Sequence, residues 1–273
     1  MKIKDHSVSR EDFELVYNSE YDWYKTNPVP SDLNRYYQSE DYISHTDSKR
    51  SLFENIYHFV KQFTLNQKER LLSSYVSGKG NLLDIGAGTG DFLAFARSKN
   101  WQVTGIEPSS KAKELALKKE VYFVESTQDL PTNSFDVITM WHVLEHVEDL
   151  EFQVRELKRI TKPGGYIFVA VPNYKSFDAS YYKEYWAAYD VPRHLWHFSK
   201  KSIEKLFSEN DFVLKRTRPM YFDSFYVSLL SEKYKSGKMN FIKAFFIGLV
   251  SNIRGLFSKE FSSHIYILKN TKN

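Results

Sequence analysis

The stretch LLDIGAGTG, residues 82–90, constrains the fold more than any other part of this 273-residue chain. An apolar run ends in an acid, glycines follow at 86, 88 and 90, and the next residues place apolar side chains on one side of a helix. Glycine lets the backbone turn sharply and lets a ligand approach main-chain N–H groups that a Cβ would shield. We therefore predict a strand, a glycine turn and a helix, with a ligand bound at the turn.

Strands and helices alternate after this turn. Apolar periodicity predicts strands at residues 101–107, 121–126, 135–140, 166–173, 211–219 and 262–270, and helices at 108–119, 151–165 and 200–210. Such alternation is typical of a mainly parallel sheet with helices on both faces. The sequence therefore predicts an α/β fold.

The same pattern sets the domain organisation. A core at residues 81–273 follows an N-terminal segment at 1–80, in which apolar patterns between 51 and 76 predict a helical cap. Two insertions interrupt the core after its fifth and sixth strands, an aromatic one at 174–197 and a partly apolar one at 221–260. We expect the cap and the insertions to cover the ligand site.

Composition excludes several classes of function. The net charge of +4 comes from 38 basic and 34 acidic residues, a balance that argues against a dedicated nucleic-acid binder. The absence of cysteine excludes disulfides, thiolate metal sites and cysteine nucleophiles. The charged N-terminus lacks the apolar core of a signal peptide, so we expect a cytoplasmic protein.

The glycine turn predicts a nucleoside-like ligand without a diphosphate. A dinucleotide fingerprint needs a third glycine where this chain has Asp91, and a carboxylate there is a poor neighbour for a pyrophosphate. Glu107 ends the next predicted strand, where an acid accepts hydrogen bonds from the ribose hydroxyls. The alternative is a tight structural turn followed by a surface glutamate. The joint occurrence of strand, turn, helix and acid favours the ligand site.

Four motifs together resemble the class I S-adenosylmethionine (SAM) dependent methyltransferases, and most nearly the group that contains the ubiquinone-biosynthesis O-methyltransferases. They are LLDIGAGTG, IEP, LPTNSFDVITM and ITKPGGYIFVAVPN, and the resemblance covers residues 81–215. It implies a Rossmann-like, doubly wound sheet of seven strands, mainly parallel, with the last strand antiparallel. It also implies SAM as cofactor and transfer of its methyl group to a small-molecule acceptor, with oxygen favoured as the acceptor atom.

The resemblance also assigns residues to the cofactor. The glycine turn and Asp84 shape the methionine and ribose pocket, Glu107 holds the ribose, and the loop at residues 126–130 borders adenine. Many relatives have an acid in place of Ser126, so the adenine contact passes to Gln128, Asp129 or the backbone. The complete set of expected cofactor residues is Asp84, Gly86, Ala87, Gly88, Gly90, Glu107, Ser126, Gln128, Met140, Trp141 and His142.

The segment WHVLEH, residues 141–146, raises the question of a metal site. His142, Glu145 and His146 have the spacing of an inverted zinc-protease motif, but the segment follows a strand directly instead of lying on a long helix. Some quinone-type relatives are thought to bind a divalent ion here, with an acid where this chain has His142. We predict that no metal binds and that Glu145 and His146 fix the turn by hydrogen bonds.

The acceptor site is expected in the aromatic insertion and the N-terminal segment. Tyr185 and Trp186 suit a planar ring or a sugar, because aromatic faces stack on either, and Tyr42 is expected to contribute from the N-terminal segment. A hydrophobic cap without ligand contact is the alternative. Arg193 is a candidate for an anionic substrate group, although a surface salt bridge is the commoner role.

Two histidines of the segment YDVPRHLWHFS are candidates for the general base. Histidine titrates near neutral pH, so His194 is the first candidate and His197 the second, with packing or capping as the alternative for both.

The stretch MNFIKAFFIGLVSNIRGLF, residues 239–257, is apolar nearly all round. It could rest on a membrane surface, act as a lid or form a dimer contact, but a buried helix explains the same pattern and is favoured. The oligomeric state is not predicted. The alternatives to an enzyme of this kind are a non-catalytic SAM-binding scaffold or regulator and, less favoured because of Asp91, a nicotinamide-dependent oxidoreductase.

Overall fold

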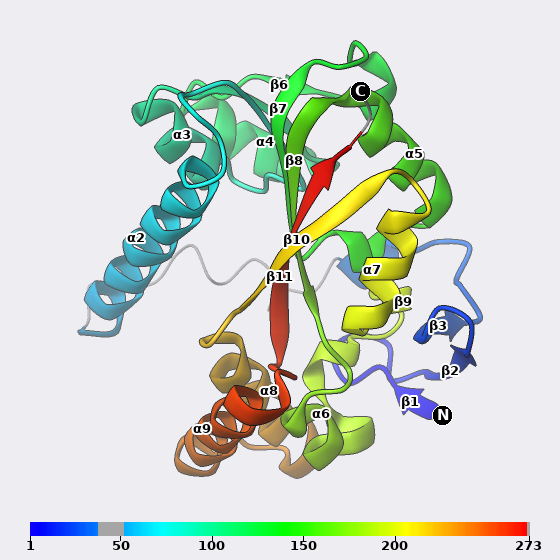
Figure 1. Ribbon diagram of the computed structural model, residues 1–273. Coiled ribbons are helices and arrows are strands. Elements are labelled where there is room, and N and C mark those ends of the chain that lie inside the picture. Colours follow the sequence, from blue (N-terminus) through cyan, green and yellow to red (C-terminus); the bar gives the residue numbers. More distant parts are fainter. Residues whose placement is uncertain (38–51, 272–273) are drawn as a thin grey trace.

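The computed structural model describes residues 1–37 and 52–271, with side chains described from residue 62 onward in the second range. A central sheet of seven strands divides the molecule, in the order β10-β11-β8-β7-β4-β5-β6 (Figure 1). Its strands are β4 (Asn81–Ile85), β5 (Gln102–Ile106), β6 (Phe123–Val124), β7 (Phe135–Trp141), β8 (Thr161–Pro172), β10 (Phe212–Pro219) and β11 (Ser263–Asn270).

The strand directions confirm the predicted Rossmann-like topology. Strands β4, β5, β6, β7 and β8 are parallel to one another, whereas β11 is antiparallel to both β8 and β10. The chain therefore begins its sheet in the middle, at β4, and builds outward on both sides. The carboxyl ends of β4, β5 and β7 consequently meet at one edge, which is where ligands of such sheets bind.

Helices cover both faces of this sheet, as the alternating pattern predicts. On one side lie α2 (Leu52–Ser73), α3 (Asp91–Ser98) and α4 (Ser110–Leu117), and on the other α5 (Leu150–Ile160) and α7 (Lys200–Ser208) (Figure 1). Helix α5 ends at Ile160, earlier than the predicted end at residue 165. Proline disfavours helical backbone in the residue before it, so Pro163 limits the helix from its C-terminal side.

The N-terminal segment corrects the expected helical cap. Helix α2 is a single helix, but it is preceded by β1 (Lys2–Lys4), β2 (Asp12–Asn18) and β3 (Trp23–Asn27), which form a second, antiparallel sheet with β9 (Trp196–His197). In β2, Phe13 and Leu15 are buried while Glu14 between them is exposed. This period of two residues is the signature of a half-buried strand, and it is the signal that the helical interpretation missed.

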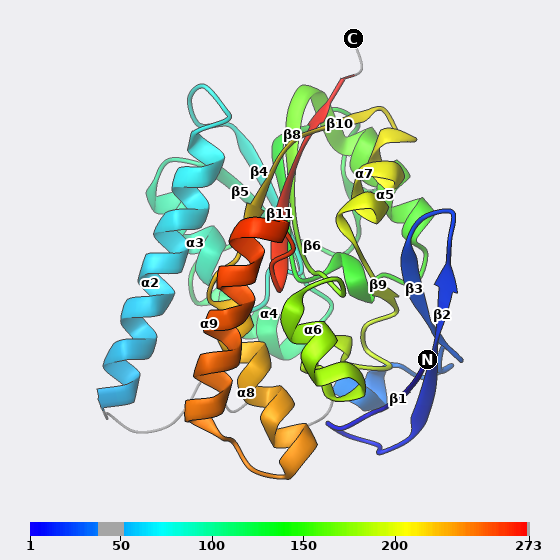
Figure 2. The same ribbon diagram turned by 60° about the horizontal axis from the view of Figure 1, so that its bottom comes forward.

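The two insertions form a layer below the central sheet (Figure 2). The first carries α6 (Phe177–Tyr182), two short 3₁₀ turns and β9, and the second folds as the hairpin of α8 (Asp223–Ser236) and α9 (Phe241–Ser258). Among the described residues, α9 is long and apolar enough to cross a membrane by length and composition alone. The favoured interpretation of α9 as a buried helix is wrong for most of its surface, because its large apolar side chains are exposed.

Candidate functional site

The glycine turn folds against the end of the neighbouring strand. The N–H groups of Gly86 and Ala87 donate to the carbonyl oxygen of Ile106 over 2.8 and 3.0 Å. The N–H of Gly88 donates to Oε2 of Glu107 over 2.8 Å. The structure thus brings together the turn and the carboxylate that the sequence assigns to one nucleoside site.

The three glycines of the turn serve different purposes. All have positive φ angles, of 72°, 53° and 72° for Gly86, Gly88 and Gly90, a region that side chains rarely adopt. A Cβ on Gly86 would lie 2.3 Å from Cγ2 of Val143, and one on Gly90 would lie 2.8 Å from Cβ of Ala116. Gly88 has no such neighbour within 4 Å, so its open side is where a ligand can approach the backbone.

Asp84, near the end of β4, is a buried carboxyl group with a raised pKa. Its Oδ1 accepts a hydrogen bond of 2.5 Å from the hydroxyl of Thr139, and its side chain is otherwise removed from solvent. Burial raises the pKa of Asp84 to about 7, although the hydrogen bond and the charge of Lys68 both lower it. At neutral pH this carboxyl is poised to ionise when a cation binds beside it.

Lys68 reaches the same place from α2. Its Nζ lies 4.2 Å from the ring centre of Trp141 and 5.7 Å from that of Phe92. Burial lowers the pKa of Lys68, while the negative charges of Asp84 and Asp223 raise it. Sequence reasoning missed this lysine, because it lies on a helix that precedes the core and no local motif marks it.

Trp141 supplies an unused donor to this site. Its ring packs edge to face with that of Phe92, at 5.7 Å between centroids. Its Nε1 is buried and has no partner among the residues that the structure describes. A buried N–H without a partner is costly, so this group is available to a ligand. Met140 before it is fully buried and supports the floor of the site by packing.

His142 lies between two carboxylates. Its Nδ1 is 3.2 Å from Oε1 of Glu145, and its Nε2 is 3.1 Å from Oδ2 of Asp223 at the start of α8. Burial alone would lower the pKa of His142, but the two carboxylates raise it to about 10, so the ring is cationic at neutral pH. Its φ of 58° is held by a 2.9 Å hydrogen bond from its N–H to the carbonyl oxygen of Ala170. Asp223 was not predicted, because the insertion that carries it has no recognisable motif.

The side chains that come closest to a metal-ligand arrangement are not those of the sequence motif His142, Glu145 and His146, because His194 takes the place of His142. Among the described residues, Glu145, His146 and His194 each place a ligand atom within 4.8 Å of the others, whereas His142 is engaged with Asp223. Oε2 of Glu145 is buried and has no partner in the described part of the chain. One carboxylate and two imidazoles form a donor set that suits zinc or iron. The absence of a metal stays a prediction.

The side chain of His146 forms hydrogen bonds to two distant segments, whereas the sequence predicts that it fixes the turn into the following helix. Its Nδ1 lies 2.9 Å from the carbonyl oxygen of Arg193 and 3.0 Å from the hydroxyl of Tyr37. The ring of His194 packs edge to face on that of His146, with centroids 4.6 Å apart. The N-terminal segment and the first insertion therefore both meet the segment that follows β7.

The two candidate bases occupy different surroundings. His194 places Nδ1 2.8 Å from the carbonyl oxygen of Ala188, and burial holds its pKa well below the usual value. His197 lies in β9, with Nε2 3.0 Å from Oγ1 of Thr26, and burial lowers its pKa to about 3. Only His194 contacts the segment after β7. The surroundings of His197, between β9 and the small sheet, argue for a packing role.

The loop expected beside adenine is a 3₁₀ turn with its own cap. Oγ of Ser126 accepts from the N–H of Gln128 over 3.2 Å, and Oδ2 of Asp129 accepts from the N–H of Ser126 over 3.0 Å. These bonds occupy Ser126 and Asp129 with the turn itself. The side chain of Gln128 is exposed and is the one left to reach a base.

Of the residues expected to bind the acceptor, two are engaged within the protein. Trp186 is 2% exposed and donates from Nε1 to Oδ2 of Asp178 over 2.7 Å, which argues against a place in the acceptor pocket. The guanidinium of Arg193 forms a largely buried ion pair with Asp190, which differs from the surface salt bridge of the alternative interpretation. Tyr185 is half-buried and lies beside the ring of His6, with centroids 5.3 Å apart. Tyr42 lies outside the described residues.

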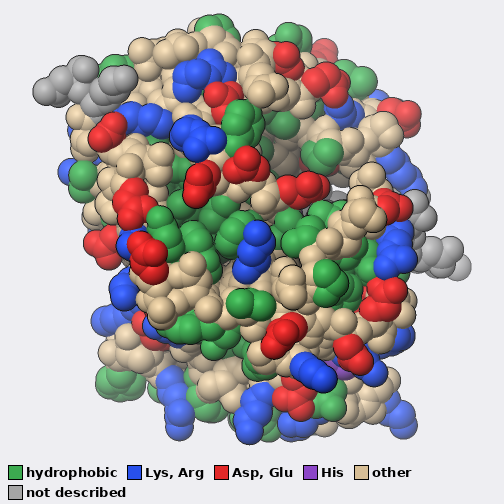
Figure 3. All heavy atoms as spheres, turned by 90° about the vertical axis from the view of Figure 1, so that its right-hand side faces the viewer, with side chains coloured by type: hydrophobic (Ala, Val, Ile, Leu, Met, Phe, Trp, Pro, Cys, Tyr) green, Lys and Arg blue, Asp and Glu red, His purple; other side chains and the backbone are tan. Residues whose placement is uncertain are grey.

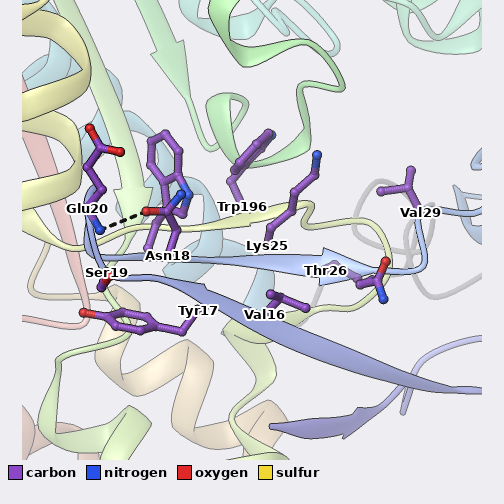
Figure 4. Close-up of a pocket in the computed structure, with 11 residues that line it drawn as sticks. Val16, Tyr17, Asn18, Ser19, Glu20, Lys25, Thr26, Val29 and Trp196 are labelled. Carbon is purple, nitrogen blue, oxygen red and sulfur yellow. Dashed lines mark hydrogen bonds between the residues drawn. The ribbon is translucent and has the colours of Figure 1, made fainter.

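A second hollow lies on the small sheet, on the side of the molecule shown in Figure 3, where hydrophobic side chains gather between charged ones. This hollow is open to solvent, has a volume of about 900 Å³ and contains none of the expected cofactor residues. Lys25 lies over Trp196, with Nζ 4.7 Å from the ring centre, and Figure 4 shows both side chains above β3. The residues that line this hollow are Val16, Tyr17, Asn18, Ser19, Glu20, Trp23, Lys25, Thr26, Asn27, Val29 and Trp196.

Comparisons with known proteins agree with this architecture. A family model described as a methyltransferase domain matches residues 46–216. A ubiquinone biosynthesis O-methyltransferase of Albidiferax ferrireducens is 34% identical over 103 residues, which make up 34% of this chain and 41% of the relative. An uncharacterised methyltransferase of Schizosaccharomyces pombe is 33% identical over 111 residues, or 34% of this chain and 40% of that protein. The chain thus spans less than half the length of these curated relatives.

A solved structure extends the likeness of fold over most of the chain. It is a geranyl diphosphate C-methyltransferase from Streptomyces coelicolor A3(2), in complex with Mg²⁺, geranyl diphosphate and S-adenosyl-L-homocysteine. The TM-score is 0.55 at 15% identity, and the match covers 85% of this chain and 88% of the other.

Proposed function

Because the chain belongs to the methyltransferase-domain family, we propose that it transfers the methyl group of S-adenosylmethionine to an oxygen atom of a small-molecule acceptor. The observation that carries this proposal is the contact of 2.8 Å between the N–H of Gly88 and the carboxylate of Glu107, beside the open face of the glycine turn. That arrangement offers backbone, carboxylate and space to one adenosyl group.

The carboxylate of Glu107 is already oriented for ribose. Oε2 accepts from the N–H of Gly88, and Oε1 accepts from the N–H of Ser109 over 2.9 Å. Each carboxylate oxygen can accept more than one hydrogen bond. Both oxygens can therefore receive the ribose hydroxyls without breaking the backbone contacts that fix them.

The charges of Asp84 and Lys68 match those of the methionine part of SAM. The ammonium group of SAM would lie at Asp84, and its binding would favour the ionised form of that carboxyl. The carboxylate of SAM would pair with Lys68, and the unused Nε1–H of Trp141 offers it a further donor. The carboxylate of Asp84 and the ammonium group of Lys68 thus complement the two charges of the methionine part of SAM.

The bound sulfonium supplies an activated methyl group, so the protein mainly has to align the acceptor and remove its proton. His194 is the proposed base. Burial keeps its ring neutral. If Nδ1–H donates to the carbonyl oxygen of Ala188, Nε2, which lies 3.8 Å from Oδ2 of Asp190, carries the lone pair that would take the hydroxyl proton as the methyl bond forms. The buried carboxylate of Glu145 partly opposes the effect of burial on the pKa of His194, and it would stabilise the resulting imidazolium.

For the acceptor we favour an aromatic or sugar-like molecule. The ring of His6 packs against those of Tyr185 and Tyr234, at centroid distances of 5.3 and 5.1 Å, and such aromatic groups can stack on a planar ring or a sugar. The oxidoreductase alternative loses support, since Asp91 opens α3 and pairs with Lys119 over 2.8 Å, leaving a carboxylate at the helix start where a pyrophosphate would lie.

Transfer of labelled methyl groups tests the proposal. Purified protein is incubated with methyl-labelled SAM and a small-molecule extract, and the fraction of label moved into product is measured. We expect label in one or a few products and its loss in Glu107→Ala. Glu151→Ala, which changes an exposed glutamate on α5, is the matched control. Normal SAM binding without any transfer would favour the scaffold alternative.

A further inference from the structure

Helix α9 presents bulky apolar side chains to the outside of the molecule. Nine of its 18 residues are large hydrophobic residues that are at least 36% exposed. We call these nine side chains the apolar face of α9; they are Phe241, Ile242, Phe245, Phe246, Leu249, Val250, Ile253, Leu256 and Phe257. A continuous apolar surface of this kind marks an interaction site in a folded protein.

The inner face of α9 fixes this orientation. The helix buries only its small residues, Ala244, Gly248, Ser251 and Gly255. A Cβ on Gly248 would lie 3.0 Å from the backbone of Phe225, and one on Gly255 would lie 2.6 Å from the ring of Phe261. Oγ of Ser251 donates to Oδ1 of Asp178 over 2.6 Å. Rotation that buried the large side chains would therefore clash with α8 and break this buried bond.

The charge of the hairpin is strongly one-sided. Residues 223–259, which span the hairpin, contain six basic residues and two acidic ones, Asp223 and Glu232, whereas the other parts of the chain hold 32 residues of each sign. The net charge of +4 therefore lies on the hairpin, although Glu232 pairs with Lys243 over 2.9 Å. The six basic residues are Lys233, Lys235, Lys238, Lys243, Arg254 and Lys259. An occupant of the apolar face should therefore be both apolar and anionic.

Two other occupants fit less well. The segment at residues 38–51, QSEDYISHTDSKRS, has only Tyr42 and Ile43 as large apolar residues, too few to cover nine. A symmetric dimer through this face would bring the same basic residues of two copies together, and like charges repel. An anionic lipid surface offers acyl chains to the apolar side chains and headgroups to the cations.

We propose that the α8–α9 hairpin docks the protein on an anionic membrane, with α9 lying in the interface. An 18-residue helix is about 27 Å long, close to the hydrocarbon thickness of about 30 Å. Crossing the bilayer would nevertheless remove Ser251 from Asp178 and place Arg254 in hydrocarbon. Lying flat keeps the inner face packed. Because Asp223 of α8 contacts His142, the docking surface and the candidate site share one hairpin.

Co-sedimentation with lipid vesicles tests this docking without SAM, so its failure is separable from failure of the proposed methyl transfer. Phosphatidylcholine vesicles with and without phosphatidylglycerol are compared. We expect binding to the anionic vesicles, weakened by salt, and a loss of about tenfold or more in the triple variant Ile242→Asn/Phe246→Asn/Phe257→Asn. The control, Val16→Asn/Leu117→Asn/Val213→Asn, changes three exposed apolar side chains on β2, α4 and β10, which are 44–61% exposed, and should bind normally.

Three results would overturn the proposal: no binding of the native protein to anionic vesicles, equal loss in both triple variants, or a native dimer that only the α9 variant dissociates. Both triple variants should fold, because the changed side chains are exposed. Thermal unfolding of each variant checks this. A second variant, Lys235→Glu/Lys238→Glu, should weaken binding to anionic vesicles while leaving the apolar face intact.

Discussion

At the residue scale, Asp84 combines a cost in stability with a role in the site. Its pKa is raised from 3.8 to about 7, so the folded protein holds this proton more tightly than the unfolded chain. The contribution of Asp84 to the unfolding free energy therefore falls as pH rises between about 4 and 7, and a constant penalty remains above 7.

Asp84→Asn should remove this penalty. One pKa unit corresponds to about 1.4 kcal/mol, so we expect the variant to gain up to a few kcal/mol of stability relative to the native protein above neutral pH. The gain should vanish in acid, and SAM should bind more weakly throughout. Urea unfolding as a function of pH measures the first effect, and parallel stability curves for the two proteins would contradict the account.

Lys68 tests the proposed contact with the methionine carboxylate. Hydrogen bonds to charged groups contribute roughly 1.5–3 kcal/mol, so Lys68→Met should raise the Kd for SAM by about tenfold or more. Lys111→Met, an exposed lysine on α4, serves as the control. Binding of 5′-methylthioadenosine, which lacks the carboxylate, should be unchanged, and an equal loss for both ligands would refute the pairing.

At the element scale, α8 is tied to the segment after β7 by Asp223 and His142. The pKa of His142 is raised to about 10, so the stabilisation it provides is present below 6.5 and is lost as pH rises through about 10. Asp223→Asn should lower the pKa of His142, and the unfolding free energy of this variant should fall less as the pH rises towards 10. NMR titration of the imidazole measures the pKa directly; an unchanged value would mean that the ion pair is absent in solution.

The elements also show which features could be predicted from the sequence. The strand, turn and acid around Gly88 and Glu107 are local patterns, and the structure contains them as predicted. Lys68 and Asp223 come from distant elements, and only tertiary packing brings them to the pocket. Trp186 shows a limit of prediction within a single segment. An aromatic-rich stretch does not reveal which ring faces a ligand and which ring is buried.

At the scale of the whole molecule, the N-terminal segment and the first insertion are not separate layers. Strand β9 pairs with β3, so residues 1–27 and 196–197 share one sheet beside the core. Residues 223–259 of the remaining insertion carry a net charge of +4, whereas the other parts of the chain hold equal numbers of basic and acidic residues. The cytoplasmic location stays a prediction.

Titration calorimetry with S-adenosylhomocysteine, SAM and NAD tests the central claim, that an adenosyl group binds between the glycine turn and Glu107. We expect both sulfur ligands to bind the native protein and the Glu151→Gln control with equal affinity. Glu107→Gln should weaken both by about tenfold or more, because it removes the charge that receives the ribose hydroxyls. Tight binding of NAD alone, or unchanged affinity in Glu107→Gln, would contradict the account.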